Sequence, residues 1–460
     1  MIKAPPYAGL LEPAATRHGG LPVAQATNIL HRLAYTKQRL AIAGASFLPS
    51  TPEWEVKCAL ALHAWLDGQH AAALYGRIAE LREPPPSAAD IPDRILEAAL
   101  DEFLAANDTG DRIGAIYAGV RPCFREAVAR YLTITNELCD QPSVRVLRAI
   151  GSDEERIRQW SDAIVLGAGA DAWARHVRQW VAAAGGLAGL DDRLEPPEAR
   201  HRLPYAPDIL PRRDTRFRGV YDTSTPADVV YLDEERPADE RNAALMFKRI
   251  REMDVPEVIA GIIAQRWSDA RNRGDRGEPW TYYTAMLRQM WDEARHAMLG
   301  QALLESHGID WTALPVNVTF SWKLARFCSP IERHILLYAI EQSLMPRAHG
   351  KPYEHRVAGE SGDALSALFH DYDWADEVLH VHIARRYLKP ELPGGLGEAR
   401  RKADELWVRV AAALERDPLP ADAGDAAVAE WWPRFARAVL SRDVAAVGST
   451  HVKDWRPLSG

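Results

Sequence analysis

Apolar residues recur at three- and four-residue steps through most of the chain, among alanine, leucine, arginine and glutamate residues that favour helices. This pattern predicts one helical block over residues 25–187 and a second over residues 237–388. Between them, residues 195–236 lose the helical period and gain prolines, arginines and short β-branched pairs. The sequence therefore predicts an all-α protein in which a linker or surface strap joins two helical blocks.

These breaks predict a division into four segments. They are an N-terminal helical domain (residues 1–194), the linker or strap (195–236), a second helical domain (237–390), and C-terminal helices with a tail (391–460). The last segment should contain helices over residues 397–416 and 427–441, followed by an irregular tail from Gly448. Inside the first domain, Ser152-Asp153-Glu154-Glu155 resembles a capping box and predicts that a helix begins at Ser152.

Two similar motifs in the second domain contain the candidate metal ligands. Asp292-Glu293-Ala294-Arg295-His296 and Asp376-Glu377-Val378-Leu379-His380 each place Glu and His at positions i and i+3, so both side chains leave one face of a helix. A four-helix bundle that holds two metal ions needs two such pairs and one carboxylate from each of two further helices. Glu257 and Glu341 are candidates, because each precedes the glutamate of one motif by 36 residues.

The charges of this set explain why metal is expected. Four buried carboxylates would cost several kcal/mol each without compensation. Two divalent cations would cancel their charge, and two neutral imidazoles would complete the ligand set. Carboxylate and imidazole ligands favour iron or manganese over metals that prefer thiolates. The predicted ligands are Glu257, Glu293, His296, Glu341, Glu377 and His380. For the first of these, the alternative is Glu252, which lies on a different helical face.

A simpler explanation exists for each motif. A chain of this composition should contain about one Glu-x-x-His by chance, and Glu198-Ala199-Arg200-His201 in the linker is such a case. Neighbouring residues could orient the ligands or simply belong to the core, namely Tyr338, His334, His370 and Asp373. Arg295 could neutralise Asp292 or Asp376, or could be solvated.

Residues 240–390 resemble the ferritin-like superfamily of di-iron carboxylate bundles, in particular bacterial ferritin-like proteins with a run of the type RQxWDExRH. Here that run is Arg288-Gln289-Met290-Trp291-Asp292-Glu293-Ala294-Arg295-His296. The resemblance implies an antiparallel four-helix bundle with the six ligands named above. The N-terminal domain could be a degenerate ferritin-like repeat without metal, or an unrelated helical domain. It has only Asp67-Gly68-Gln69-His70 as a comparable motif, which leaves open a single-metal site at Asp67 and His70.

The remaining composition limits the class of protein. The formal net charge of -8 argues against a nucleic-acid surface. The four cysteines lie far apart and form no CxxC pair, as expected for free thiols in the cytoplasm. The sequence has no apolar run of membrane-spanning length, and its first residues lack the apolar core of a signal peptide. We therefore expect a cytoplasmic protein.

The favoured function is an oxidase or oxygenase that holds two iron ions, or one manganese and one iron, and uses O2 as co-substrate on a small organic substrate. An electron donor and a homodimeric state are further expectations. The alternative is a ferritin-like protein that oxidises or handles iron without an organic substrate. A third class is a structural bundle whose polar core needs no metal.

Overall fold

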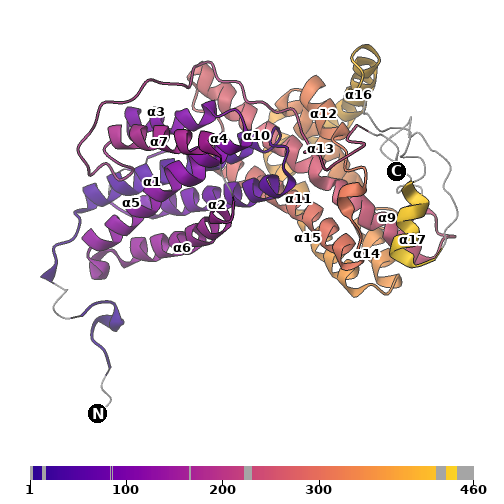
Figure 1. The fold of residues 1–460 in the computed structure, drawn as a ribbon, viewed down its shortest axis with the longest axis horizontal. Helices are drawn as coiled ribbons and strands as arrows, with labels where there is room; N and C mark the ends of the chain where they lie inside the picture. Colours follow the sequence, from indigo (N-terminus) through magenta and orange to yellow (C-terminus); the bar gives the residue numbers. More distant parts are fainter. Residues whose placement is uncertain are drawn as a thin grey trace. The chain divides into compact units, whose positions relative to one another are not determined.

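The computed structural model describes residues 4–12, 17–82, 84, 86–164, 167–221, 230–420 and 431–442. Over these residues the chain forms helices joined by loops and no strand (Figure 1). The all-α prediction is therefore confirmed. The second helical block was expected over residues 237–388, and its helices run from Ala238 to Tyr387. The predicted tail from Gly448 lies outside the described residues.

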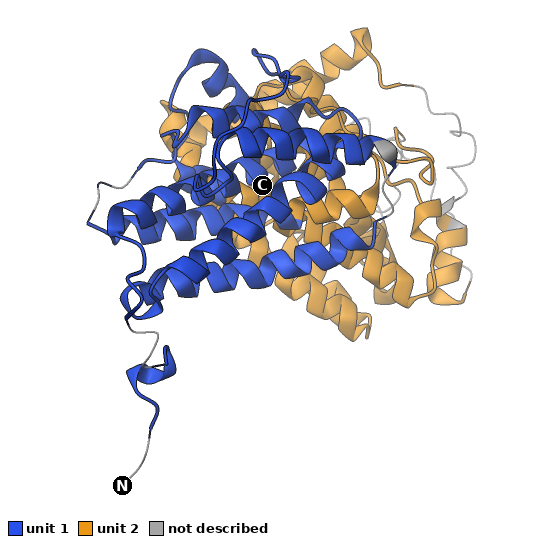
Figure 2. Ribbon diagram, turned by 60° about the vertical axis from the view of Figure 1, so that its left-hand side comes forward, with its two compact units in different colours: residues 1–47, 62–206, 267–284 blue, residues 48–61, 207–266, 285–460 orange. Residues whose placement is uncertain are grey.

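The chain divides into two compact units (Figure 2). Unit 1 comprises residues 1–47, 62–206 and 267–284, and unit 2 comprises residues 48–61, 207–266 and 285–460. These borders differ from the domain borders expected from the sequence. The difference arises because three long helices, α2, α10 and α11, contribute residues to both units, and composition does not mark a border inside a continuous helix.

Unit 1 contains most of the N-terminal helices. They are α1 (Val23–Phe47), the C-terminal part of α2 (Trp54–Ala79), α3 (Arg94–Glu102), η3 (Phe103–Ala105), α4 (Thr109–Ile113), the π-helix η4 (Gly114–Val120), α5 (Arg121–Ile134), α6 (Glu137–Asp162) and α7 (Ala168–Ala183), after a short turn η1 (Tyr7–Gly9). Helix α7 packs along η4, α3 and α4, and α5 packs along α6. The expected helix start at Ser152 is wrong, because Ser152 lies inside α6.

Unit 2 contains most of the remaining helices, including those that carry the predicted ligands. They are α9 (Ala238–Ile250), η5 (Arg251–Met253), α10 (Asp254–Arg273), α11 (Trp280–Ser306), η6 (Trp311–Ala313), α12 (Thr319–Phe327), α13 (Pro330–Ser343), α14 (Lys351–Glu360), α15 (Ala364–Tyr387), η7 (Lys389–Glu391), α16 (Gly395–Arg416) and α17 (Trp431–Leu440). Helix α14 packs along α15 and α9, while α13 packs along α15 and α16 (Figure 1).

Local sequence explains where the two ligand-bearing helices α13 and α15 begin. Ser329 and Glu332 form a capping box, in which the Ser329 amide donates to the Glu332 carboxylate at 2.8 Å, and Pro330 occupies the first turn. Asp363 caps α15 by accepting from the Ser366 amide at 2.9 Å. These signals fix the helix starts and thereby the direction in which the ligand side chains point.

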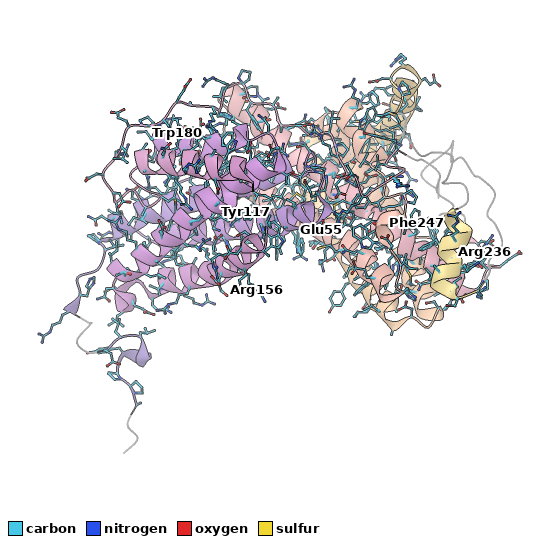
Figure 3. All side chains as sticks on the ribbon, in the orientation of Figure 1. Glu55, Tyr117, Arg156, Trp180, Arg236 and Phe247 are labelled. Atoms are coloured by element: carbon cyan, nitrogen blue, oxygen red, sulfur yellow. The ribbon has the colours of Figure 1, made fainter. Side chains whose placement is uncertain are left out.

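The core of unit 2 is apolar and tightly packed. Helix α9 contributes Leu245, Met246, Phe247 and Ile250, and Trp54 contacts this cluster from the start of α2. Figure 3 labels Phe247 among these side chains. Burial of such side chains favours folding by about 1.5–3 kcal/mol each relative to exposure. Ala297 of α11 belongs to the same core and directly follows His296 of the polar cluster described below.

Two glycines permit close approach of backbones beside that cluster. A Cβ atom on Gly300 of α11 would lie 2.4 Å from the backbone nitrogen of Ile250, so glycine lets α11 pack against the end of α9. A Cβ atom on Gly350 would lie 2.1 Å from the carbonyl oxygen of Leu344, so glycine also permits the tight turn that precedes α14. Both contacts place residues of the candidate site.

The segment expected to be a strap has no helix over residues 191–221, and its polar groups bind to each unit. In unit 1 the backbone amides of Arg200 and His201 donate to Glu102 at 2.8 and 3.1 Å. In unit 2 the Arg216 guanidinium pairs with Glu55 at 2.7 Å. Separately, a search of the described residues finds no helix whose apolar stretch could span a bilayer.

Candidate metal centre

Five segments of unit 2 direct polar side chains into its interior. Helix α11 supplies Glu293 and His296, α15 supplies Glu377 and His380, and α13 supplies Glu341, all of them at most 3% exposed. The short helix η5 supplies Glu252, and α14 supplies Lys351. Five of the six predicted ligands therefore meet at one place, and the sixth does not.

The first possible ion position is formed by Glu293, Glu341, Glu377 and His380, which can each offer one ligand atom within 4.8 Å of the others. The Nδ1 atom of His380 lies 3.0 Å from Glu293 and 3.6 Å from Glu377. We call this group the first position.

The second possible ion position is formed by Glu252, Glu293 and His296 under the same criterion. The Nδ1 atom of His296 lies 3.4 Å from Glu293 and 3.8 Å from Glu252. Another overlapping group joins His296 with Asp373 and Glu377. Because Glu293 belongs to both positions, it could bridge two ions. We call the group of Glu252, Glu293 and His296 the second position.

The two motifs support each other across the bundle. The Nε2 atom of His296 lies 3.2 Å from Asp376 on α15, and the Nε2 atom of His380 lies 3.5 Å from Asp292 on α11. Each motif therefore supplies the aspartate that orients the histidine of the other motif. In this orientation the Nδ1 atom of that histidine faces the centre of the cluster. Arg295 pairs with Asp292 at 2.7 Å and with Asp376 at 2.6 Å, so of its two expected roles it has the neutralising one.

Glu257 needs correction as a member of the cluster. Its carboxylate pairs with Lys57 at 2.5 Å, with Arg213, and with the Ser321 hydroxyl at 2.8 Å. Two cations therefore already neutralise it. Glu252 reaches the cluster instead, from the 3-10 turn η5 that precedes α10.

Burial and neighbouring charges shift the pKa values of this cluster in both directions. Burial alone would raise the pKa of Glu293, but His296 and His380 outweigh it and lower this pKa. Burial raises the pKa of Glu341 well above its usual value, and the nearby Glu377 and Glu293 add to the effect. Burial alone would lower the pKa of His296, but Asp373, Asp376 and Glu293 outweigh it and raise this pKa to about 10. The pKa of His380 is raised for the same reason, by Asp292, Glu293 and Glu377.

The cluster also contains buried polar atoms without hydrogen-bond partners. Among the described residues these include the Nδ1 atoms of His296 and His380, the Nε2 atom of His380, and one carboxylate oxygen each of Glu341 and Glu377. Buried polar atoms are ordinarily satisfied, so atoms of this kind that converge on a point fit a bound cation. The oxygen and imidazole donors suit iron, manganese or zinc. The residues present therefore fit the metal that the sequence predicts.

Sequence reasoning missed two important neighbours of the second position. Asp373 had been considered only as an orienting residue, yet it offers a ligand atom beside His296 and Glu377. It precedes Glu377 by one helical turn, so its place on the same face could have been recognised. Lys351 lies 2.8 Å from Glu377 and 2.9 Å from Asp373, and no motif marks it.

The other candidates from the sequence occupy surrounding places. His370 lies 3.3 Å from Arg249 and 3.8 Å from Glu354, and burial lowers its pKa to about 3. The Tyr338 hydroxyl reaches Gln342 on its own helix at 3.5 Å. Burial likewise lowers the pKa of His334 to about 3, with Arg266 as the nearest charge. None of these three belongs to the first or second position.

Unit 1 has a related cluster with different charges. The Nε2 atom of His70 lies 2.9 Å from Asp153, which parallels the pairing of His296 with Asp376. Asp67 and Glu154 stand where two ligand carboxylates would be expected, but Lys37 and Arg121 ion-pair with both. Ile157 follows Glu154 at the spacing where α15 has His380.

Two side-chain cations thus compensate the acids of unit 1. Among the described residues, the groups that could hold a metal all lie in unit 2. Asp67 and His70 are therefore not brought together as ligands, because Asp67 is already paired with Lys37 at 2.8 Å and with Arg121 at 2.6 Å.

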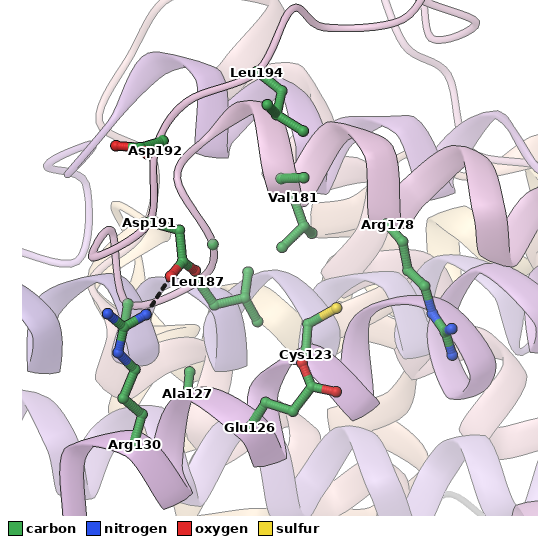
Figure 4. A pocket seen from close by; sticks show the side chains of 13 residues that line it. Cys123, Glu126, Ala127, Arg130, Arg178, Val181, Leu187, Asp191, Asp192 and Leu194 are labelled. Carbon is green, nitrogen blue, oxygen red and sulfur yellow. Dashed lines mark hydrogen bonds and ion pairs between the residues drawn. The ribbon is translucent and has the colours of Figure 1, made fainter.

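Unit 1 also has a pocket of about 490 Å³ between α5, α7 and the loop after α7. Figure 4 shows Cys123 and Arg178 on its walls and the ion pair between Arg130 and Asp191 at one side. Its charged groups pair with each other or face solvent, so it offers no cluster comparable to that of unit 2.

Comparison with protein-family models, curated proteins and solved structures finds no match for this chain. Its function must therefore be inferred from the site.

Proposed function

We propose that unit 2 is a ferritin-like di-metal centre which binds two iron ions, or one manganese and one iron, and uses O2 to oxidise a small organic substrate. The supporting observation is that Glu293 belongs to two adjoining groups of ligands, each of which has its own histidine and its own further glutamate.

The roles of the residues follow from their positions. Glu293 would bridge the ions, His380 and Glu341 would bind one of them, and His296 and Glu252 would bind the other. Glu377 would be a further ligand, since it belongs to one group with His380 and to another with His296. When bound, two such ions supply the electrons and coordination sites that O2 activation requires.

The surrounding protein would keep the centre ordered and dry. Asp292 and Asp376 hold the histidines by their Nε2 atoms, and Arg295 holds both aspartates in turn. Nearly complete burial of the ligand side chains excludes bulk water, which strengthens each electrostatic interaction. An oxygenase reaction also consumes electrons, so we propose an external electron donor.

The metal assignment is tested by changing single ligands. Protein purified after loading with Fe²⁺ should contain iron, whereas Glu293→Ala and His380→Ala should lose it while keeping their helical circular dichroism. His382→Ala is the matched control, because His382 is exposed on the same helix two residues away. Full iron retention by folded Glu293→Ala and His380→Ala would refute the proposal.

The organic substrate is tested separately by oxygen uptake. With a chemical reductant as electron donor, the iron-loaded protein should consume more O2 when it is supplied with amines, phenols or carboxylic acids than it does without them. Among the described residues the chain carries one such cluster, and its length of 460 residues favours an enzyme over a minimal iron store. If no organic compound raises the uptake above that of Fe²⁺ and the reductant, iron oxidation is the function.

A further inference from the structure

The two ion positions differ in their surrounding charge. At the first position, Glu341 accepts a hydrogen bond at 2.5 Å from the neutral amide of Gln289, and Glu293 approaches the two histidines. Three carboxylates therefore meet there, and only Glu377 has a lysine partner among the described residues. This position attracts a cation strongly.

At the second position, protein cations already approach the carboxylates. The ammonium group of Lys351 lies 2.8 Å from Glu377, 2.9 Å from Asp373 and 3.7 Å from Glu252. The guanidinium of Arg249 pairs with Glu252 at 2.6 Å and with Asp373 at 2.7 Å. Much of the negative charge near His296 is therefore compensated before any metal arrives.

Lys351 is held in this place by the backbone around it. It is the first residue of α14, and its amide donates to the carbonyl of Leu344 at 2.8 Å. The tight turn at Gly350 allows this contact. The residue is 1% exposed, so its ammonium group has no nearby solvent into which it could move.

We propose that the centre has two unequal metal positions and that Lys351 makes them so. The first position binds a divalent cation tightly. The second binds it weakly, because the ammonium group of Lys351 repels the ion and competes for Glu252 and the adjoining Asp373. The ions therefore load in order. This inference rests on the proposed metal centre and concerns how it fills.

Titration with Mn²⁺, followed by electron paramagnetic resonance, measures both steps. Unbound Mn²⁺ gives a strong six-line spectrum, and a spin-coupled pair differs from a single bound ion. The wild-type chain should bind one ion tightly and a second at least about tenfold more weakly. Lys351→Met should strengthen the second step by at least about tenfold. Lys351→Gln should do the same if the methionine variant does not fold.

Two further variants separate charge from other effects. Lys351→Arg keeps the positive charge and should keep the second step weak. Lys57→Met is the matched control, because Lys57 is another buried lysine of unit 2 that pairs with a glutamate outside the cluster. It should leave both steps unchanged.

The outcomes distinguish this inference from the proposed function. Two equally tight ions in the wild-type chain, or no change in Lys351→Met and Lys351→Gln, would overturn the role of Lys351 while the metal centre stands. Failure of every variant and of the wild-type chain to bind Mn²⁺ or Fe²⁺ would overturn both.

Discussion

Glu252 and Glu257 lie five residues apart, and their pKa values shift in opposite directions. Glu257 is paired with Lys57 and Arg213, and these cations outweigh the effect of burial and lower its pKa. For the pKa of Glu252, burial has the largest effect and raises it, although Arg249 and Lys351 act in the opposite direction. Glu252, unlike Glu257, also offers a ligand atom within 4.8 Å of those of Glu293 and His296. We therefore assign Glu252, and not Glu257, to the second position.

Substitution of these two glutamates should separate their roles. At saturating Mn²⁺ the wild-type chain and Glu257→Gln should bind two ions, whereas Glu252→Gln should bind one. Glu257→Gln should instead lower the free energy of unfolding by about 3 kcal/mol, because it leaves Lys57 and Arg213 buried without their carboxylate. Binding stoichiometry and denaturant unfolding measure the two effects. Loss of an ion from Glu257→Gln alone would reverse the assignment.

Metal binding should also depend on pH. The metal-free site keeps protons on His296, whose pKa is raised to about 10, and on His380, whose pKa is also raised well above its usual value. A metal must displace these protons, so the apparent affinity should rise with pH from about 6 towards 10, approaching tenfold per pH unit for each proton released. Titrations with Mn²⁺ at several pH values measure the slope. An affinity independent of pH would contradict this protonation state.

At the scale of helices, α11 and α15 form a reciprocal pair. Each carries a ligand glutamate, a ligand histidine and the aspartate that orients the opposite histidine. The arrangement requires the two helices to hold a fixed register, and Gly300 helps by letting α11 approach the end of α9, which precedes Glu252 and carries Arg249. Loss of an aspartate should therefore affect the ion bound from the opposite helix.

Asp376→Asn should weaken the second position, where His296 binds, and Asp292→Asn should weaken the first, where His380 binds. We expect a loss of about 10–100-fold in affinity at the affected position, because the histidine loses its orienting acceptor. Spectroscopic titration with Mn²⁺ identifies the affected step. If each substitution instead weakens the position on its own helix, the reciprocal arrangement is wrong.

Particular elements explain how far the sequence could predict this site. Glu-x-x-His on long helices correctly brought Glu293, His296, Glu377 and His380 to one place, because the spacing of a helix fixes which side chains share a face. Glu341 was located by its distance from Glu377 and lies in the cluster. The same distance failed for Glu257, because its carboxylate is paired with Lys57 and Arg213, which come from distant segments. Lys351 has no local signal. That the cluster binds metal remains a prediction.

At the scale of the whole molecule, the two units compensate the charge of their buried acids in different ways. In unit 1, Asp67 and Glu154 are neutralised by Lys37 and Arg121. In unit 2, two side-chain cations, Lys351 and Arg249, face a larger set of acids, namely Glu252, Glu293, Glu341, Asp373 and Glu377. The resemblance of the motifs fits a repeat in which unit 1 serves folding, while unit 2 keeps the ligands. The chain should therefore bind two metal ions and not four.

Lys37→Met tests this division of roles. It removes a buried cation from Asp67 and Glu154, so the free energy of unfolding should fall by about 3–5 kcal/mol. The number of metal ions bound per chain should stay at two, because no ligand of unit 2 changes. Calorimetry and metal analysis measure the two quantities. A folded Lys37→Met protein that gains or loses a stoichiometric ion would contradict the metal-free role of unit 1.

The most direct measurement is an anomalous difference map from crystals equilibrated with saturating Mn²⁺ and recorded above the manganese absorption edge. The predicted result is two peaks on either side of Glu293, one among Glu341, Glu377 and His380 and the other beside Glu252 and His296. A map without a peak in this cluster, or with its strong peaks elsewhere in the chain, would contradict the proposal that unit 2 is a di-metal centre.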